Sequence, residues 1–159
     1  MKLATFRHNG SVRPTVCFKN LVVDMEWVLG KPLLKYMLSF LNAGNDILFK
    51  VIKVVENLEN NPPQIDGRSV FYEKEVELLA PLSNPGKIIC IGQNYKDHYR
   101  EQSIEPPKAP IIFAKWPSRI IGPNEKILLP KESSMVDYEA KLAFVIGQKR
   151  TAYLKKACL

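Results

Sequence analysis

Prolines and glycines divide the second half of this chain into short segments. Twelve of its 159 residues are prolines, and the pairs Pro85-Gly86, Pro106-Pro107 and Gly122-Pro123 separate apolar runs of only a few residues. Proline removes a backbone donor and ends helices, so runs bounded in this way are typical of strands joined by turns. The pattern disfavours long bundled helices and predicts a β-rich second half.

The first sixty residues have a different pattern, in which strand spacing gives way to helical spacing. Strands are expected on both sides of Gly10 and at residues 21–24. Apolar residues then recur at helical intervals, first in a helix with Pro32 at its start and afterwards in a helix that Asp46 caps. These elements predict a small N-terminal α+β unit.

A breaker-rich segment, NPPQIDGRSV at residues 61–70, separates the two patterns. We therefore predict an α+β fold in which residues 1–60 form the N-terminal unit, 61–74 a linker and 75–159 the start of a β-rich domain. Short strands are expected in the second part at residues 76–80, 87–91, 111–115, 127–129 and 136–146.

The positive net charge is concentrated at one end of the chain. The net charge of the chain is +7. Residues 149–159 hold four basic residues and no acid, so residues 1–148 carry a net charge of 7 − 4 = +3. No RNA-recognition motif or zinc-finger spacing accompanies this charge. The sequence therefore predicts no nucleic-acid partner.

Cysteine content and hydropathy indicate where in the cell the protein is located. Cys17, Cys90 and Cys158 are odd in number and form no C-x-x-C pair, which indicates reduced thiols rather than a disulfide framework or a zinc site. No apolar run approaches the length of a membrane-spanning helix, so no membrane partner is expected. We predict a cytoplasmic protein. The alternative is mitochondrial, because the acid-free, basic stretch before Asp24 also has the composition of a transit peptide.

The segment KIICIGQNYKDHYREQ, residues 87–102, combines a buried-type strand with a short helix that starts near Asn94. His98 and Glu101 are three residues apart, so on a helix they share one face, where a carboxylate can orient an imidazole for proton transfer. The alternative is an ordinary surface histidine beside a glutamate.

A second cluster lies in MVDYEAKLAFVIG, residues 135–147, where alternation places Asp137, Glu139 and Lys141 on one strand face. Two carboxylates at this spacing are a beginning for a Mg²⁺ or Mn²⁺ site. The alternative is a solvated sheet face, which Lys141 favours because it would pair with Glu139.

A third cluster is cationic and follows the strand expected at 111–115. Lys115, Ser118 and Arg119 lie at its end, among prolines and a glycine. Such a strand end is suited to an anionic substrate, and it is equally typical of a solvated loop.

In order along the chain, these segments resemble the fumarylacetoacetate hydrolase family. The residues that carry the resemblance are KIICIGQNYKDHYREQ, PPKAPIIFAKWPSRIIGP, ILLP and VDYEAKLAFVIG, preceded by EVELLAPLSNPGKI. The resemblance implies a β-roll catalytic domain that forms a homodimer. It also implies an enzyme that uses Mg²⁺ or Mn²⁺ to act on small oxoacids, by hydrolysis of a carbon–carbon bond or by decarboxylation.

The resemblance assigns roles to particular residues. His98 and Glu101 match the family's acid–base dyad, and Tyr95 and Lys115 match substrate-binding positions. Glu139 matches the first of two strand glutamates that hold the metal together with an aspartate farther along.

Two departures from the family pattern leave two readings open. The second glutamate position holds Lys141, whose ammonium has no lone pair for a cation, and the sequence reaches Leu159 before the expected aspartate. One reading is a metal-dependent oxoacid enzyme. The other is a catalytically inactive, shortened product or incomplete sequence that at most associates with a full-length relative.

Overall fold

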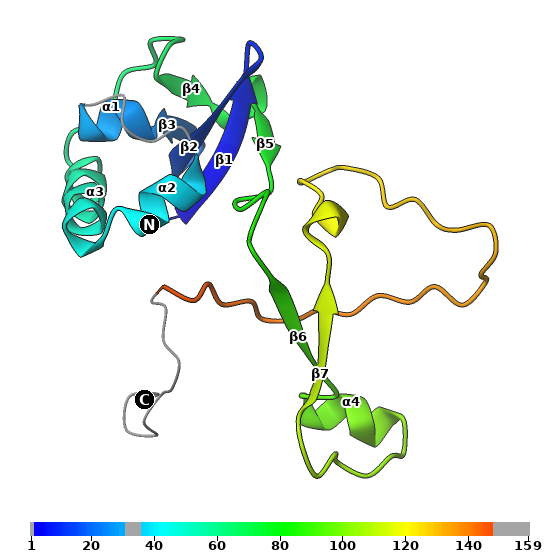
Figure 1. Ribbon diagram of the computed structural model, residues 1–159. Helices are drawn as coiled ribbons and strands as arrows, with labels where there is room; N and C mark the ends of the chain where they lie inside the picture. Colours follow the sequence, from blue (N-terminus) through cyan, green and yellow to red (C-terminus); the bar gives the residue numbers. More distant parts are fainter. Residues whose placement is uncertain (1, 31–35, 148–159) are drawn as a thin grey trace.

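The computed structural model describes residues 2–30 and 36–147 (Figure 1). It contains helices and antiparallel strands, arranged as a sheet with helices on one face, followed by a two-stranded ribbon and an extended segment. In this part of the chain no helix combines the length and the apolar character needed to cross a bilayer. Pro32, Cys158 and the basic stretch 149–159 lie outside the described residues.

Three consecutive strands form the centre of the first sheet, and the sequence predicts all three. β1 (Lys2–His8) pairs with β2 (Ser11–Phe18), which pairs with β3 (Leu21–Asp24), both antiparallel. The first connection is the dipeptide Asn9-Gly10, whose φ angles of 49° and 76° are both positive. Positive values at both positions are what a tight hairpin turn requires.

Two further strands complete the sheet, and both come from sequence that we assigned to other parts of the molecule. β4 (Val70–Tyr72) pairs with β3, and β5 (Glu77–Leu79) pairs with β1, so the order is β4-β3-β2-β1-β5. The strand expected at 76–80 therefore belongs to the first sheet rather than to the β-rich second part. The division into units at residues 60 and 75 stays a prediction.

Physical contacts account for the position of these edge strands. Val70 and Phe71 in β4 are almost fully buried. In β5, the Glu77 carboxylate accepts from the Arg7 guanidinium at 2.8 Å, and the Thr5 hydroxyl donates to the Pro81 carbonyl at 2.8 Å just beyond the strand. Burial of apolar side chains thus holds β4, which we predicted as part of the linker, and cross-strand contacts hold β5, which we predicted as a strand of the second part.

An Asp66 turn leads into β4. Its Oδ1 atom accepts backbone N–H groups from Arg68, Ser69 and Val70 at 2.7 to 2.9 Å. Burial raises the pKa of Asp66, but the hydrogen bonds from these N–H groups together outweigh it and hold the pKa below the ordinary aspartate value. Part of the predicted linker is therefore an ordered turn.

Helices α1 (Met25–Leu29), α2 (Met37–Asn42) and α3 (Asn45–Asn57) lie on one face of the sheet (Figure 1). The sequence patterns predict α2 and α3, and they miss α1; the expected start of the first predicted helix, at Pro32, lies outside the described residues. Gly44 rather than Asp46 is the N-cap of α3, and Asp46 lies in its first turn. The sharp turn at Gly44, with φ of 89°, starts the helix two residues before the expected cap.

The core lies between the sheet and these helices. Fully buried side chains on this side include Val16, Val23, Met25 and Val51, and a smaller cluster groups Phe6 with Val22 and Phe71. Among the described residues, every buried hydrophobic side chain lies at or before Phe71. The N-terminal sheet and its helices therefore hold the packed core of this part of the chain.

A buried ion pair links β2 to the start of α1. Asp24 is 1% exposed; one of its carboxylate oxygens accepts from the Glu26 N–H at 2.8 Å, and the other pairs with the Arg13 guanidinium. Burial raises the pKa of Asp24, although the Glu26 N–H and Arg13 act in the opposite direction. Asp24 is thus both the N-cap of α1 and the counter-ion of Arg13.

The second part contains the strands β6 (Ile88–Gly92) and β7 (Ile111–Lys115), with α4 (Lys96–Glu101) in the connection between them. The strands expected at 127–129 and 136–146 are not formed: both segments are extended but lie in no ladder. Apolar alternation gives a strand only when a partner strand is present, and the described residues supply none here. A β-roll stays a prediction.

Amide hydrogen exchange is expected to divide the described residues sharply. The amides of β1, β2 and β3 should exchange slowest, because they are hydrogen-bonded and covered by the core, and those of 126–134, which are exposed and lie in no helix or strand, should exchange at nearly the rate of an unfolded chain. Exchange followed by mass spectrometry in a dilute monomer tests this. Slow exchange throughout 126–134 would contradict it.

Candidate functional site

The β6–β7 ribbon carries four of the candidate residues. The strands pair antiparallel from Ile88 opposite Lys115 to Gly92 opposite Ile111. A Cβ atom on Gly92 would lie only 3.3 Å from the Ile111 Cγ2 atom, so glycine permits this close pairing at the end of the ribbon. Tyr95, His98 and Glu101 then follow β6 in the α4 region, and Lys115 ends β7.

The predicted acid–base pair lies on α4, as expected, but its two side chains have different surroundings. His98 is half-buried, and the nitrogen of the Gln102 side-chain amide lies 3.5 Å from its Nε2 atom. Glu101 is exposed. The helical spacing is therefore confirmed, whereas a dyad in which Glu101 orients the imidazole stays a prediction.

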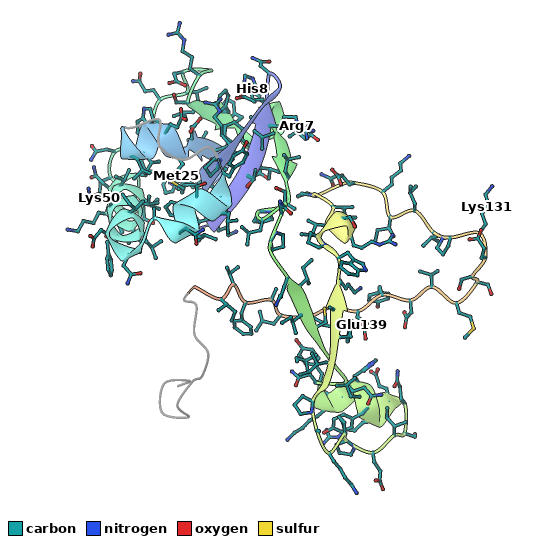
Figure 2. All side chains as sticks on the ribbon, in the orientation of Figure 1. Arg7, His8, Met25, Lys50, Lys131 and Glu139 are labelled. Atoms are coloured by element: carbon teal, nitrogen blue, oxygen red, sulfur yellow. The ribbon has the colours of Figure 1, made fainter. Side chains whose placement is uncertain are left out.

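The segment around Glu139 lies against this ribbon. The backbone N–H of Leu142 donates to the Tyr95 hydroxyl oxygen at 3.0 Å, across 47 residues of sequence. Next to it, the Lys141 ammonium lies 5.7 Å from the centre of the Phe113 ring in β7. Figure 2 shows Glu139 beside β7. The structure thus brings together the two motif segments that carry Tyr95 and Glu139.

Glu139 and Lys141 form an ion pair on this segment. The Lys141 Nζ atom lies 3.2 Å from the Glu139 Oε2 atom, and the two side chains are 25% and 43% exposed. This is the contact that the solvated-face alternative predicts. Asp137 does not join them, because its carboxylate accepts from the Tyr138 N–H at 2.7 Å.

These residues do not fit a divalent ion. Residues 2–30 and 36–147 contain no group of three or more His, Cys, Asp or Glu side chains placed to hold a metal. An ammonium about 4 Å from a dication, at an effective dielectric of about 20, would repel it by about 8 kcal/mol. Glu139 is the one predicted ligand in the chain, and its neighbouring cation is Lys141.

The third predicted cluster lies at the end of the ribbon. Lys115 is exposed, and Ser118 and Arg119 lie in a short 3₁₀ turn, Pro117–Arg119, where both are also exposed. Successive side chains of a strand alternate between its faces, so Lys115 lies on the same face of β7 as Phe113.

The sequence patterns did not predict two features near the site. Phe113 was interpreted only as a strand residue, although its spacing from Lys115 shows that the two share a face. An open groove of about 400 Å³ lies beside α4, lined by Ile91, Gly92, Gln93, Asn94, Tyr99 and residues 106–110. The prolines of that loop were interpreted only as turn residues.

Comparison with known proteins connects these segments to one family. Residues 87–157 match the family model described as fumarylacetoacetate hydrolase, C-terminal. A bovine protein named mitochondrial oxaloacetate tautomerase FAHD2A is 45% identical over 121 residues, which are 76% of this chain and 35% of the relative. A Xenopus laevis protein named mitochondrial oxaloacetate tautomerase fahd2 is 55% identical over 80 residues, 50% of this chain and 25% of the relative.

Two broader matches include the N-terminal part. A Dictyostelium discoideum protein named fumarylacetoacetate hydrolase domain-containing protein 2 homolog is 38% identical over 153 residues, 94% of this chain and 47% of the relative. A crystal structure described as a candidate HpcE protein from Mycobacterium smegmatis is similar in fold, with a TM-score of 0.54 and 21% identity over 80% of this chain and 40% of the other.

The chain spans between 25% and 47% of the length of these curated relatives. The matched region contains β6, α4, β7 and the Glu139 segment, which are the elements that bear the ordered motifs. On the family match, the named relatives and these motifs together, this chain belongs to the fumarylacetoacetate hydrolase family and is similar within it to the domain-containing protein 2 members.

Proposed function

We propose that the ribbon and the Glu139 segment bind a small oxoacid and move a proton at the carbon next to its keto group. The hydrogen bond between Tyr95 and Leu142 is the observation that carries this proposal, because it joins the two motif segments into one surface. The relatives that are named oxaloacetate tautomerases support the substrate class. Two of these names also place the relatives in mitochondria, and we propose that location in place of the cytoplasm.

The side chains have the chemistry that such a proton transfer needs. A base removes the proton beside the keto carbon, the electron pair of that C–H bond forms a C=C bond, and the keto oxygen becomes an enolate that takes up a proton. His98 is the candidate base. Tyr95 is the candidate donor, because its oxygen accepts from Leu142 and its own O–H stays available.

The family resemblance also implies a Mg²⁺ or Mn²⁺ ion, and it implies carbon–carbon bond hydrolysis or decarboxylation as the reaction. The side chains described at this site do not fit a divalent ion, so the proposed proton transfer uses no metal. Glu101 is retained in the proposal as the residue that orients His98 once substrate is bound.

Enol–keto interconversion of oxaloacetate tests the proposal. We expect this chain to accelerate it by about 10²-fold over buffer in the presence of a chelator, the lower end of what one positioned acid–base group contributes. We expect no release of CO₂ and no hydrolysis of acylpyruvates with Mg²⁺ or Mn²⁺. The reaction is followed by the ultraviolet absorbance of the enol.

The chain offers a matched control, because His8 is its second histidine and lies in β1, packed 4.5 Å from the Phe71 ring. His98→Ala should remove the acceleration and His8→Ala should leave it. An acceleration that survives His98→Ala would refute the role of His98. CO₂ release that a chelator abolishes would instead restore the metal-dependent alternative.

A second candidate function is favoured by the Glu139–Lys141 pair. If this pair disables the site, the chain acts only by association with a full-length relative. Absence of any acceleration, together with a stable complex between this chain and a full-length relative in size-exclusion chromatography, would favour that function.

A further inference from the structure

We infer that Lys141 is a built-in cation of this site and binds the carboxylate or enolate oxygen of an oxoacid without metal. This inference rests on the proposed substrate class and adds the residue that would recognise the anion. It concerns a position for which the family pattern assigns a ligand of opposite charge.

Lys141 is held in place by two contacts that leave it able to bind more. Its ammonium lies 3.2 Å from one Glu139 oxygen and 5.7 Å from the Phe113 ring centre, and the side chain is 25% exposed. An ammonium has three N–H donors, and a single ion pair with Glu139 does not occupy all of them. An anion therefore finds free donors on a lysine whose position is already restricted.

The surroundings of Lys141 favour an anion over a cation. Lys115 lies two residues from Phe113 in β7, so it is on the same face of the strand as the aromatic ring over which Lys141 lies. Lys115 therefore adds a second basic residue to the face of the ribbon on which Lys141 pairs with Glu139. The Tyr95 hydroxyl is close by, because the residue after Lys141 donates its N–H to it.

The chemistry of the ligand follows from these groups. Two ammonium groups and a phenol O–H suit a small molecule with adjacent carboxylate and keto or enolate oxygens. Oxalate has this arrangement of oxygens and undergoes no keto–enol reaction, so it reports binding alone. Failure to bind oxalate is thereby distinguishable from failure to move a proton.

Calorimetric titration of oxalate into this chain, in the presence of a chelator, tests the inference. Lys141→Gln should weaken oxalate binding at least about 10-fold, Lys115→Gln should weaken it less, and Lys141→Arg should retain most of it because the charge remains. Lys131→Gln is the matched control, because it makes the same charge change at an exposed position far along the extended segment (Figure 2).

Oxalate binding that Lys141→Gln and Lys131→Gln reduce equally would overturn the inference, since it would reflect net charge alone. Binding that needs Mg²⁺ and disappears with the chelator would also overturn it. An unchanged far-ultraviolet circular dichroism spectrum verifies that each variant folds, which is expected because the packed core lies in the N-terminal part.

Discussion

Replacing Asp24 by alanine is expected to lower the free energy of unfolding by about 2–4 kcal/mol. The substitution removes the acceptor of the Glu26 N–H at the start of α1, which typically costs about 1 kcal/mol. It also leaves the Arg13 guanidinium, 22% exposed, without its counter-ion. Urea denaturation at neutral pH, followed by circular dichroism, measures the loss.

Asp46→Ala is the control for this substitution. Asp46 is an exposed aspartate in the first turn of α3 and is not the cap of that helix, so its loss should cost only a few tenths of a kcal/mol through the helix dipole. Equal losses for the two variants would show that the buried pair contributes nothing beyond an ordinary surface charge.

The raised pKa of Asp24 fixes the sign of a pH effect on stability when the urea denaturation is repeated from acidic to neutral pH. A carboxyl whose pKa is higher in the folded state binds protons more tightly there, so its contribution is fully present below the ordinary aspartate pKa and is lost as pH rises through the raised value. Asp24→Asn keeps a capping oxygen and cannot titrate. The stability difference between the wild-type chain and this variant should therefore shrink with rising pH across that window.

Lys141→Glu is expected to create a metal site when this chain is joined to the C-terminal part of a fumarylacetoacetate hydrolase relative. The substitution removes the ammonium beside Glu139 and adds a second carboxylate, and the family resemblance supplies an aspartate farther along. At a Mg²⁺ concentration of about 100 times Kd, ligand linkage adds about 2.7 kcal/mol, a rise in Tm of roughly 5–10 °C.

Calorimetric titration of Mg²⁺ and Mn²⁺ into the joined protein, with and without the substitution, measures the effect. The variant Lys131→Glu makes the same charge change away from Glu139 and should bind no metal. If the joined protein with Lys141 binds metal as tightly as the Glu variant, Lys141 does not occupy a ligand position. The match of Lys141 to the family's second glutamate position would then be wrong.

The sequence predicted most where neighbours along the chain determine the structure. The Asn9-Gly10 turn joins two strands that touch within a few residues, and the apolar spacing of α3 is contained in one helix. Such elements follow from local geometry and burial alone. The strands β6 and β7 were also found, because each is a short apolar run bounded by turn residues.

The patterns failed where a distant partner decides the outcome. β5 pairs with β1 across about 70 residues, which composition does not reveal, and 136–146 has strand alternation but no partner strand among the described residues. For the site, the helical spacing of His98 and Glu101 was predicted. The Tyr95–Leu142 hydrogen bond was not, because it depends on how an irregular segment crosses the ribbon.

The pairing of β1 with β5 also affects the protein while it is being made. β1 leaves the ribosome before β5, and the residue that faces Arg7 from β5, Glu77, follows 70 residues later. At about 5–20 residues per second, that interval lasts about 4–14 s, whereas a hairpin such as β1–β2 forms in microseconds. The outer edge of β1 is therefore unpaired for seconds on each nascent chain, and during synthesis strands from neighbouring chains compete with β5 for it.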